Sequence, residues 1–144
     1  MTSPSVPPYG SALLALQRTT HATLQILMAE LVDLDLTASE INALAILADG
    51  QARTVSELGA AAGTRPTTLT SVLDRLERRG HITRGTSPGD RRVVVIELTS
   101  SGGPAADTIR QTLAAVEARA LGGLPAEAVA GFYTVLRALA EVSP

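Results

Sequence analysis

The chain has 144 residues, a length that predicts one domain or one domain with a helical extension. It contains no cysteine and only two histidines, so we expect no disulfide, no metal site and no bound cofactor. It has neither a run of ~18 apolar residues nor a basic leader, and we therefore expect a cytoplasmic protein without a membrane partner.

The first third of the chain is predicted to be helical after a loose start. Residues 1–10 contain three prolines and predict a flexible N-terminal arm. Leucines at helical spacing predict a long helix over about 11–34. Thr37 and Glu40 form a capping-box pattern, which predicts a short helix over about 38–48.

Two more helices are predicted in the middle of the chain. Thr54 and Glu57 repeat the capping-box pattern and predict a small helix over 55–61. Residues 64–79 follow, with Thr64 as the expected cap. Their apolar side chains form one stripe at i, i+3, i+4 and i+7 spacing: Leu69, Val72, Leu73 and Leu76. The opposite face of this helix is polar.

The periodicity then changes to that of strands. Residues 81–84 and 93–98 predict two short strands, the second rich in β-branched side chains. Between them, residues 85–92 combine turn chemistry with a basic end. We therefore expect a β-hairpin with a long mobile tip.

Two helices are predicted to close the chain. Thr99 is the expected cap of a long helix, which the Gly-Gly-Pro sequence at 102–104 breaks or delays. A last helix starts at Leu124 and Pro125, and its expected inward side chains are Val129, Phe132, Leu136 and Leu139.

Basic residues are concentrated in the middle of the chain. The net charge is −2, but between Arg53 and Arg92 eight arginines stand against four acids, a local charge of +4. The rest of the chain carries four arginines against ten acids, a charge of −6. Because a polyanion responds to local potential, this distribution favours a nucleic-acid partner.

Three short helices followed by a hairpin form the winged helix-turn-helix pattern. We expect a mainly α fold with a small β-hairpin wing (α+β), with residues 37–98 as its DNA-binding region. A helix with one apolar and one polar face fits a major groove of about 12 Å. The candidate DNA-binding residues of that helix are Arg65, Thr67, Thr68, Ser71, Arg75 and Arg78, and those of the wing are Arg84, Asp90, Arg91 and Arg92.

The helix at 69–80, the Asp90-Arg91-Arg92 wing and the Leu98-Thr99-x-x-Gly102 exit resemble the MarR family of bacterial regulators. The resemblance implies a homodimer built by residues 11–36 and 99–144, and two reading helices about 34 Å apart on a pseudo-palindromic operator. It implies a repressor that responds to a small molecule. It also implies that the arginine at position 92 reaches the minor groove, steadied by the preceding aspartate. Many members carry a basic residue where this chain has Ser71.

The same fold would also suit a protein–protein adaptor without DNA readout, which the acidic total charge favours slightly. The sequence has no phosphate loop, nucleophile elbow or metal cluster, and we do not expect an enzyme. The candidate residues for an effector pocket are Arg18, His21, Arg110 and Tyr133.

Overall fold

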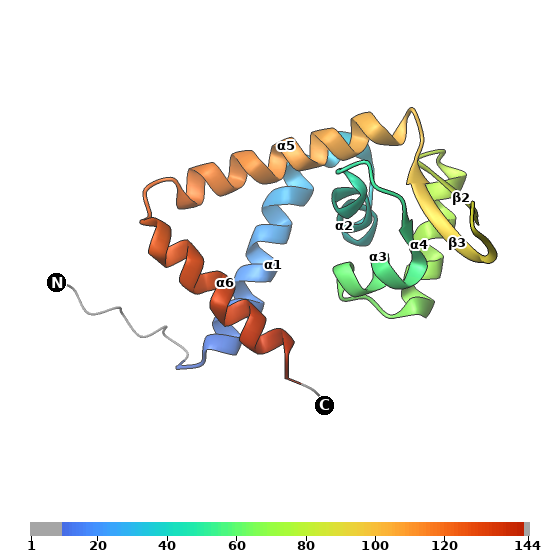
Figure 1. The fold of residues 1–144 in the computed structure, drawn as a ribbon. Helices are drawn as coiled ribbons and strands as arrows, with labels where there is room; N and C mark the ends of the chain where they lie inside the picture. Colours follow the sequence, from blue (N-terminus) through green and yellow to red (C-terminus); the bar gives the residue numbers. More distant parts are fainter. Residues whose placement is uncertain (1–9, 143–144) are drawn as a thin grey trace. The chain divides into compact units, whose positions relative to one another are not determined.

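A computed structural model describes residues 10–142 and divides the chain into two compact units, Met1–Thr112 and Leu113–Pro144 (Figure 1). Apart from Gly10, the arm predicted for residues 1–10 lies outside the described residues. Within the described part, no helix is both long and apolar enough to cross a membrane.

The first unit opens with helix α1 (Ala12–Glu30), followed by the short 3-10 helix η1 (Val32–Leu34). The prediction of one continuous helix is therefore wrong at its end. Asp35 adopts a left-handed conformation with φ of 51° and closes the segment. The guanidinium group of Arg79 donates to the backbone carbonyls at this end, which fixes the turn where a helix would otherwise continue.

Three helices and a small sheet share one hydrophobic core. The helices are α2 (Ala38–Leu47), α3 (Val55–Ala62) and α4 (Pro66–Arg78). Each contributes an apolar face, and the first turns of α5 (Gly102–Leu121) add to the core. The side chains exposed by 2% or less are Ile41, Ala43, Leu44, Leu47, Leu58, Leu69, Val72, Leu73, Leu76, Ile82, Ile96, Ala106 and Ile109.

The two predicted capping boxes form to different extents. At α3 both bonds are present: the Glu57 amide donates to Thr54 Oγ1 at 3.1 Å, and the Thr54 amide donates to Glu57 Oε1 at 3.2 Å. At α2 the Glu40 amide donates to Thr37 Oγ1 at 3.2 Å, but the Glu40 carboxylate does not return to the Thr37 amide. The second half of this prediction is wrong because Glu40 is turned into the protein.

The start of α4 also differs from the prediction. Arg65 occupies the N-cap position, and Pro66 is the first helical residue, where its missing amide hydrogen is not needed. The Thr64 hydroxyl donates to the Ala62 carbonyl at 3.4 Å and caps nothing. Gly63, with φ of 64°, ends α3 in the left-handed conformation that glycine adopts without strain.

The sheet has three antiparallel strands in the order β1-β3-β2. They are β1 (Arg53–Thr54), β2 (Ile82–Ser87) and β3 (Asp90–Leu98). The tip expected at 85–92 begins later than predicted, because pairing continues through Gly85–Val95 and Thr86–Val94. The register then shifts to the Ser87–Asp90 pair, which leaves residues 91–93 without a partner on β2. The valines of β3 favour the extended backbone that prolongs the hairpin.

Helix α5 (Gly102–Leu121) begins at the glycine that the sequence marks as a breaker. Thr99 caps it as predicted, since its Oγ1 accepts from the Gly102 amide at 3.0 Å. A Cβ at Gly102 would lie 1.8 Å from the His81 carbonyl oxygen, so only glycine fits there. Pro104 falls in the first turn, where it leaves the helix intact.

The second unit contains the remainder of α5 and helix α6 (Ala126–Ala140). No side chain of α6 is buried in the described chain, and Phe132 is 51% exposed. Val129, Leu136 and Leu139 are half-buried, so the predicted inward face differs from the structure at Phe132. The second unit contains too little other structure to cover that face.

Candidate nucleic-acid interface

The rotation of α4 is set by its buried stripe. Leu69, Val72, Leu73 and Leu76 are each exposed by 2% or less. Since these four side chains lie on one side of the helix, the opposite side must face solvent. The core thus presents a 13-residue helix whose outer face is available to a partner.

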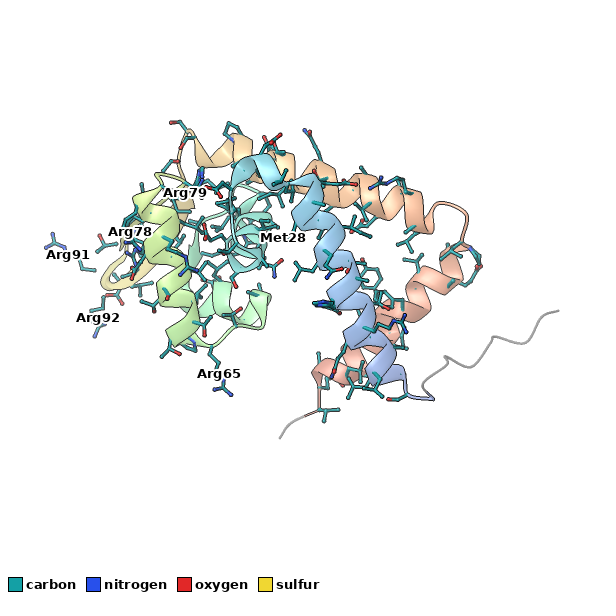
Figure 2. All side chains as sticks on the ribbon, turned by 180° about the vertical axis from the view of Figure 1, so that it is seen from behind. Met28, Arg65, Arg78, Arg79, Arg91 and Arg92 are labelled. Atoms are coloured by element: carbon teal, nitrogen blue, oxygen red, sulfur yellow. The ribbon has the colours of Figure 1, made fainter. Side chains whose placement is uncertain are left out.

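The outward face of α4 carries short polar side chains and two exposed arginines. Thr67, Thr68 and Ser71 are all exposed, as the sequence predicts for residues that approach a partner closely. Arg65 extends from the first end of the helix and Arg78 from the last turn (Figure 2). Arg78 Nε donates to the Asp74 carbonyl at 3.4 Å, whereas the Arg65 side chain makes no hydrogen bond or ion pair within residues 10–142.

The hairpin tip presents two further arginines, which Figure 2 shows extending away from the protein. Asp90 Oδ1 accepts from the backbone amide of Arg92 at 2.9 Å and from its Nε at 3.3 Å. These bonds hold the pKa of Asp90 below its usual value, the backbone bond being the larger cause. The Arg92 side chain is nevertheless 91% exposed, and Arg91 is exposed beside it.

Arg84, predicted as a wing contact, is held between two carboxylates of α4. Its Nη2 lies 2.7 Å from Asp74 Oδ1 and 2.9 Å from Glu77 Oε1. The hydrogen bonds that Arg84 donates to Glu77 and, as the smaller cause, to Asp74 raise the pKa of Arg84, and the bond to Glu77 lowers the pKa of Glu77. The side chain therefore braces β2 against α4.

Arg75 and Arg79 are also engaged inside the first unit. Arg75 Nε lies 3.3 Å from Oε1 of Glu40 on α2. Arg79 donates to the carbonyls of Leu34, at 3.0 Å, and Asp35. The structure thus separates the predicted basic cluster into arginines that tie elements together and arginines that face solvent.

The sequence did not predict the contacts that Glu40 makes with α4 and that Arg79 makes with the end of η1. The sequence predicts Glu40 only as part of a cap, although it precedes Leu44 by four residues and Leu47 by seven. That spacing places its side chain on the buried stripe of α2 and is a usable signal. The role of Arg79 has no local signal, because its acceptors lie 44 and 45 positions earlier.

Arg53 is the remaining member of the basic segment with a clear structural role. Its Nη1 donates to Asp49 Oδ1 at 2.8 Å and to the Ile46 carbonyl at 2.9 Å. The hydrogen bond from Arg53 is the main reason that the pKa of Asp49 lies well below its usual range. This pair fixes the chain between α2 and β1.

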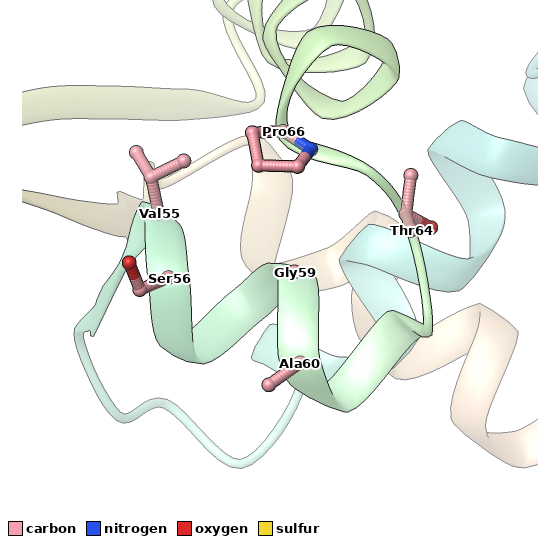
Figure 3. A pocket seen from close by; sticks show the side chains of 6 residues that line it. All are labelled: Val55, Ser56, Gly59, Ala60, Thr64 and Pro66. Carbon is pink, nitrogen blue, oxygen red and sulfur yellow. The ribbon is translucent and has the colours of Figure 1, made fainter. Parts of the chain in front are cut away.

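Two shallow depressions border the start of α3. One, of about 290 Å³, lies between α3 and the first residue of α4 (Figure 3) and is lined by Val55, Ser56, Gly59, Ala60, Thr64 and Pro66. The other, of about 410 Å³, is lined by Thr54, Val55, Ser56, Arg92, Val93 and Val94. The beginning of α3 therefore adjoins both the start of α4 and the wing.

The candidate effector residues are not assembled into either depression. Arg18 and His21 lie on α1 and Arg110 on α5, all in the first unit, and Tyr133 belongs to α6 in the second. The ring of Tyr133 lies 6.0 Å, centroid to centroid, from that of Phe132.

A helical core whose last helix faces solvent beside a basic antiparallel hairpin defines a winged-helix domain. Comparison with known proteins agrees with this class. CouR from Rhodococcus jostii, whose crystal structure is bound to p-coumaroyl-CoA, gives a TM-score of 0.84 at 24% identity, covering 97% of this chain and 99% of that one. A MarR-family regulator from Silicibacter pomeroyi gives 0.78 at 25% identity, covering 93% and 90%.

Residues 36–94 match the model of the MarR family, so this segment is a MarR-family domain. It is 31% identical over 102 residues to the HTH-type transcriptional repressor NicR of Pseudomonas putida, covering 70% of this chain and 65% of NicR. It is 36% identical over 69 residues to the uncharacterized HTH-type transcriptional regulator YcgE of Bacillus subtilis, covering 47% of this chain. The match spans only 45% of the length of YcgE. The homologues are thus transcriptional regulators.

Proposed function

We propose that this protein is a sequence-specific DNA-binding transcriptional regulator, which represses as a homodimer on a pseudo-palindromic operator and responds to a small molecule. The observation that carries the proposal is the combination of the solvent-facing polar side of α4 with the exposed arginines of the wing. Both belong to one basic segment of an otherwise acidic chain.

The dimensions of α4 support insertion into a major groove. A helix of 13 residues is about 20 Å long. Arg65 and Arg78 stand near its two ends, whereas a major groove is about 12 Å wide. Their side chains therefore suit the phosphates on the two sides of the groove, while Thr67, Thr68 and Ser71 between them approach the bases. Arg91 and Arg92 suit the flanking backbone or the minor groove.

Uncovered apolar side chains support a homodimer. On α1, Leu13 and Leu14 are 50% and 53% exposed, and on α6, Phe132 and Val135 are 51% and 50% exposed. Helices that leave such residues in water gain stability when a second copy covers them, and a stable interface buries about 1,600 Å² in total. We assign this role to the predicted regions 11–36 and 99–144.

Similar proteins support an aromatic acid as the effector. Bordetella bronchiseptica BpsR has its DNA binding regulated by 6-hydroxynicotinic acid, and NadR forms a complex with 4-hydroxyphenylacetate. Arg18, His21 and Arg110 of the first unit remain our candidates for a carboxylate-binding site, since arginine pairs well with carboxylates. Tyr133 of the second unit remains a separate candidate for an effector contact.

The proposal is tested by fluorescence anisotropy on duplexes selected from a random pool, with wild type, Arg92→Ala and the matched control Arg137→Ala on α6. Arg92→Ala should weaken binding to all duplexes and reduce the salt slope by about one per subunit, because a phosphate contact is lost. Arg137→Ala should bind as wild type does, and 4-hydroxyphenylacetate should release the DNA.

Two results would contradict the proposal. Wild type that binds no duplex even at low salt would favour the adaptor interpretation instead. An Arg92→Ala variant with unchanged affinity and salt slope would remove the wing from the interface.

A further inference from the structure

Glu40 is the one buried charged side chain in residues 10–142, with 3% of its surface exposed. Its Oε1 accepts from the Thr37 hydroxyl at 3.0 Å and from Arg75 Nε at 3.3 Å. Its Oε2 is buried and has no hydrogen-bond partner. A carboxylate at the N-terminal end of α2 is thus committed to an arginine on α4.

This contact determines the orientation of Arg75. A buried carboxylate is costly unless it is paired, and Arg75 is its only cationic partner in the described chain. The Glu40 side chain is 4% exposed, whereas the Arg75 side chain is 41% exposed. Because Nε is held on the inner side, the guanidinium loses rotational freedom while part of it still faces solvent.

The free edge of Arg75 has a defined hydrogen-bonding capacity. With Nε occupied, Nη1 and Nη2 remain, and neither has a partner among residues 10–142. Two parallel donors at the end of a guanidinium match the O6 and N7 acceptors of guanine in the major groove. Such a fixed fork loses less entropy on binding than a freely rotating arginine.

The position of Arg75 on α4 is consistent with this use. It follows Ser71 by one turn and Thr68 by two, on the outward side of the helix. Both of these side chains are short and exposed, so they do not cover the guanidinium edge.

We propose that Glu40 is a positioning residue for DNA recognition, which holds Arg75 so that its Nη1 and Nη2 read one guanine in each operator half-site. The inference rests on the proposed DNA-binding function and adds to it a base preference and its physical origin. Glu40 itself contacts no DNA.

The experiment measures base preference with the full-length protein. Wild type, Glu40→Leu, Arg75→Ala and the double variant are each bound to a selected duplex and to duplexes in which one half-site guanine at a time is replaced by adenine. Leucine at position 40 keeps the volume and leaves no buried charge, so the fold is retained. Glu97→Leu, at an exposed position of β3, is the control for the change in net charge.

For wild type and the control, one guanine replacement should weaken binding about tenfold or more, as expected for loss of a bidentate contact. Glu40→Leu should lose most of that preference, and Arg75→Ala and the double variant should lose all of it. Because no phosphate contact is removed, the salt slope should stay unchanged in all five proteins. Far-UV circular dichroism and melting temperature confirm folding.

The outcomes separate the two proposals. If wild type prefers guanine and Glu40→Leu keeps the full preference, this inference is overturned and the proposed function remains supported. If Arg75→Ala binds all duplexes more weakly by the same factor and with a smaller salt slope, Arg75 contacts a phosphate and this inference is also overturned. Wild type that binds no duplex overturns the proposed function and this inference together.

Discussion

Gly102 begins α5 where the backbone of His81 leaves no room for a side chain. In Gly102→Ala the new Cβ would lie 1.8 Å from the His81 carbonyl oxygen and 2.8 Å from its carbon. The two segments would have to separate by about 1.2 Å to reach the 3.0 Å that real Cβ contacts respect. That carbonyl also accepts the Thr99 amide at 3.0 Å, so the shift strains a hydrogen bond as well.

We expect this substitution to cost about 3 kcal/mol, from overpacking and a weakened hydrogen bond. At about 3 °C per kcal/mol for a chain of this size, the melting temperature should fall by about 10 °C. The assay is urea and thermal unfolding followed by circular dichroism at one fixed protein concentration, since dimerisation affects stability.

Gly103→Ala is the matched control. A Cβ there meets no atom within 4 Å, and alanine favours the helix, so we expect a gain of about 0.4–1 kcal/mol. Equal stability of Gly102→Ala and wild type would refute the reasoning, because it would mean that the wing and α5 do not approach as closely as described.

Two further predictions concern ion pairs of the basic segment. Arg53 lowers the folded-state pKa of Asp49 below its ordinary value of 3.8. The Asp49 carboxylate therefore adds stability that is present above pH 3.8 and is lost as the pH falls below it. Asp49→Asn should flatten the acid side of a profile of urea midpoint against pH between pH 6 and 2. An unchanged acid limb would contradict this. Arg84→Gln should cost about 1 kcal/mol by releasing Asp74 and Glu77, and should leave the salt slope of DNA binding unchanged. A slope reduced by about one per subunit would show instead that Arg84 contacts phosphate.

The sequence predicts the elements that depend on local pattern. The apolar stripe of α4 and the Thr54–Glu57 box at α3 are visible within one or two turns of helix, and both are confirmed. Contacts distant along the chain are not visible in this way. Glu40 meets Arg75 across 35 positions, and the two-residue strand β1 is too short to carry an alternation.

The candidate interface also combines features that local pattern predicts with features that depend on distant contacts. That the outward residues of α4 and the wing are exposed follows from periodicity and turn chemistry. Which arginines are free is decided by tertiary pairing. Arg75, Arg84 and Arg91 are all arginines of the same basic segment, and the sequence does not distinguish them. In the structure Arg75 and Arg84 are paired with carboxylates, whereas Arg91 is not.

Thr54 belongs to two elements at once, since it pairs with Val95 in the sheet and caps α3. The hairpin is therefore anchored as far as Val95, and only the five residues Asp90–Val94 of β3 project beyond that anchor. Val94 pairs with Thr86 and Asp90 with Ser87, so Arg91, Arg92 and Val93 have no partner on β2 and lie at the end of the hairpin. The length of the hairpin beyond Val95 therefore sets the distance between the helix and wing contacts: one added residue pair, one residue on each strand, would carry both arginines about 3.3 Å farther out.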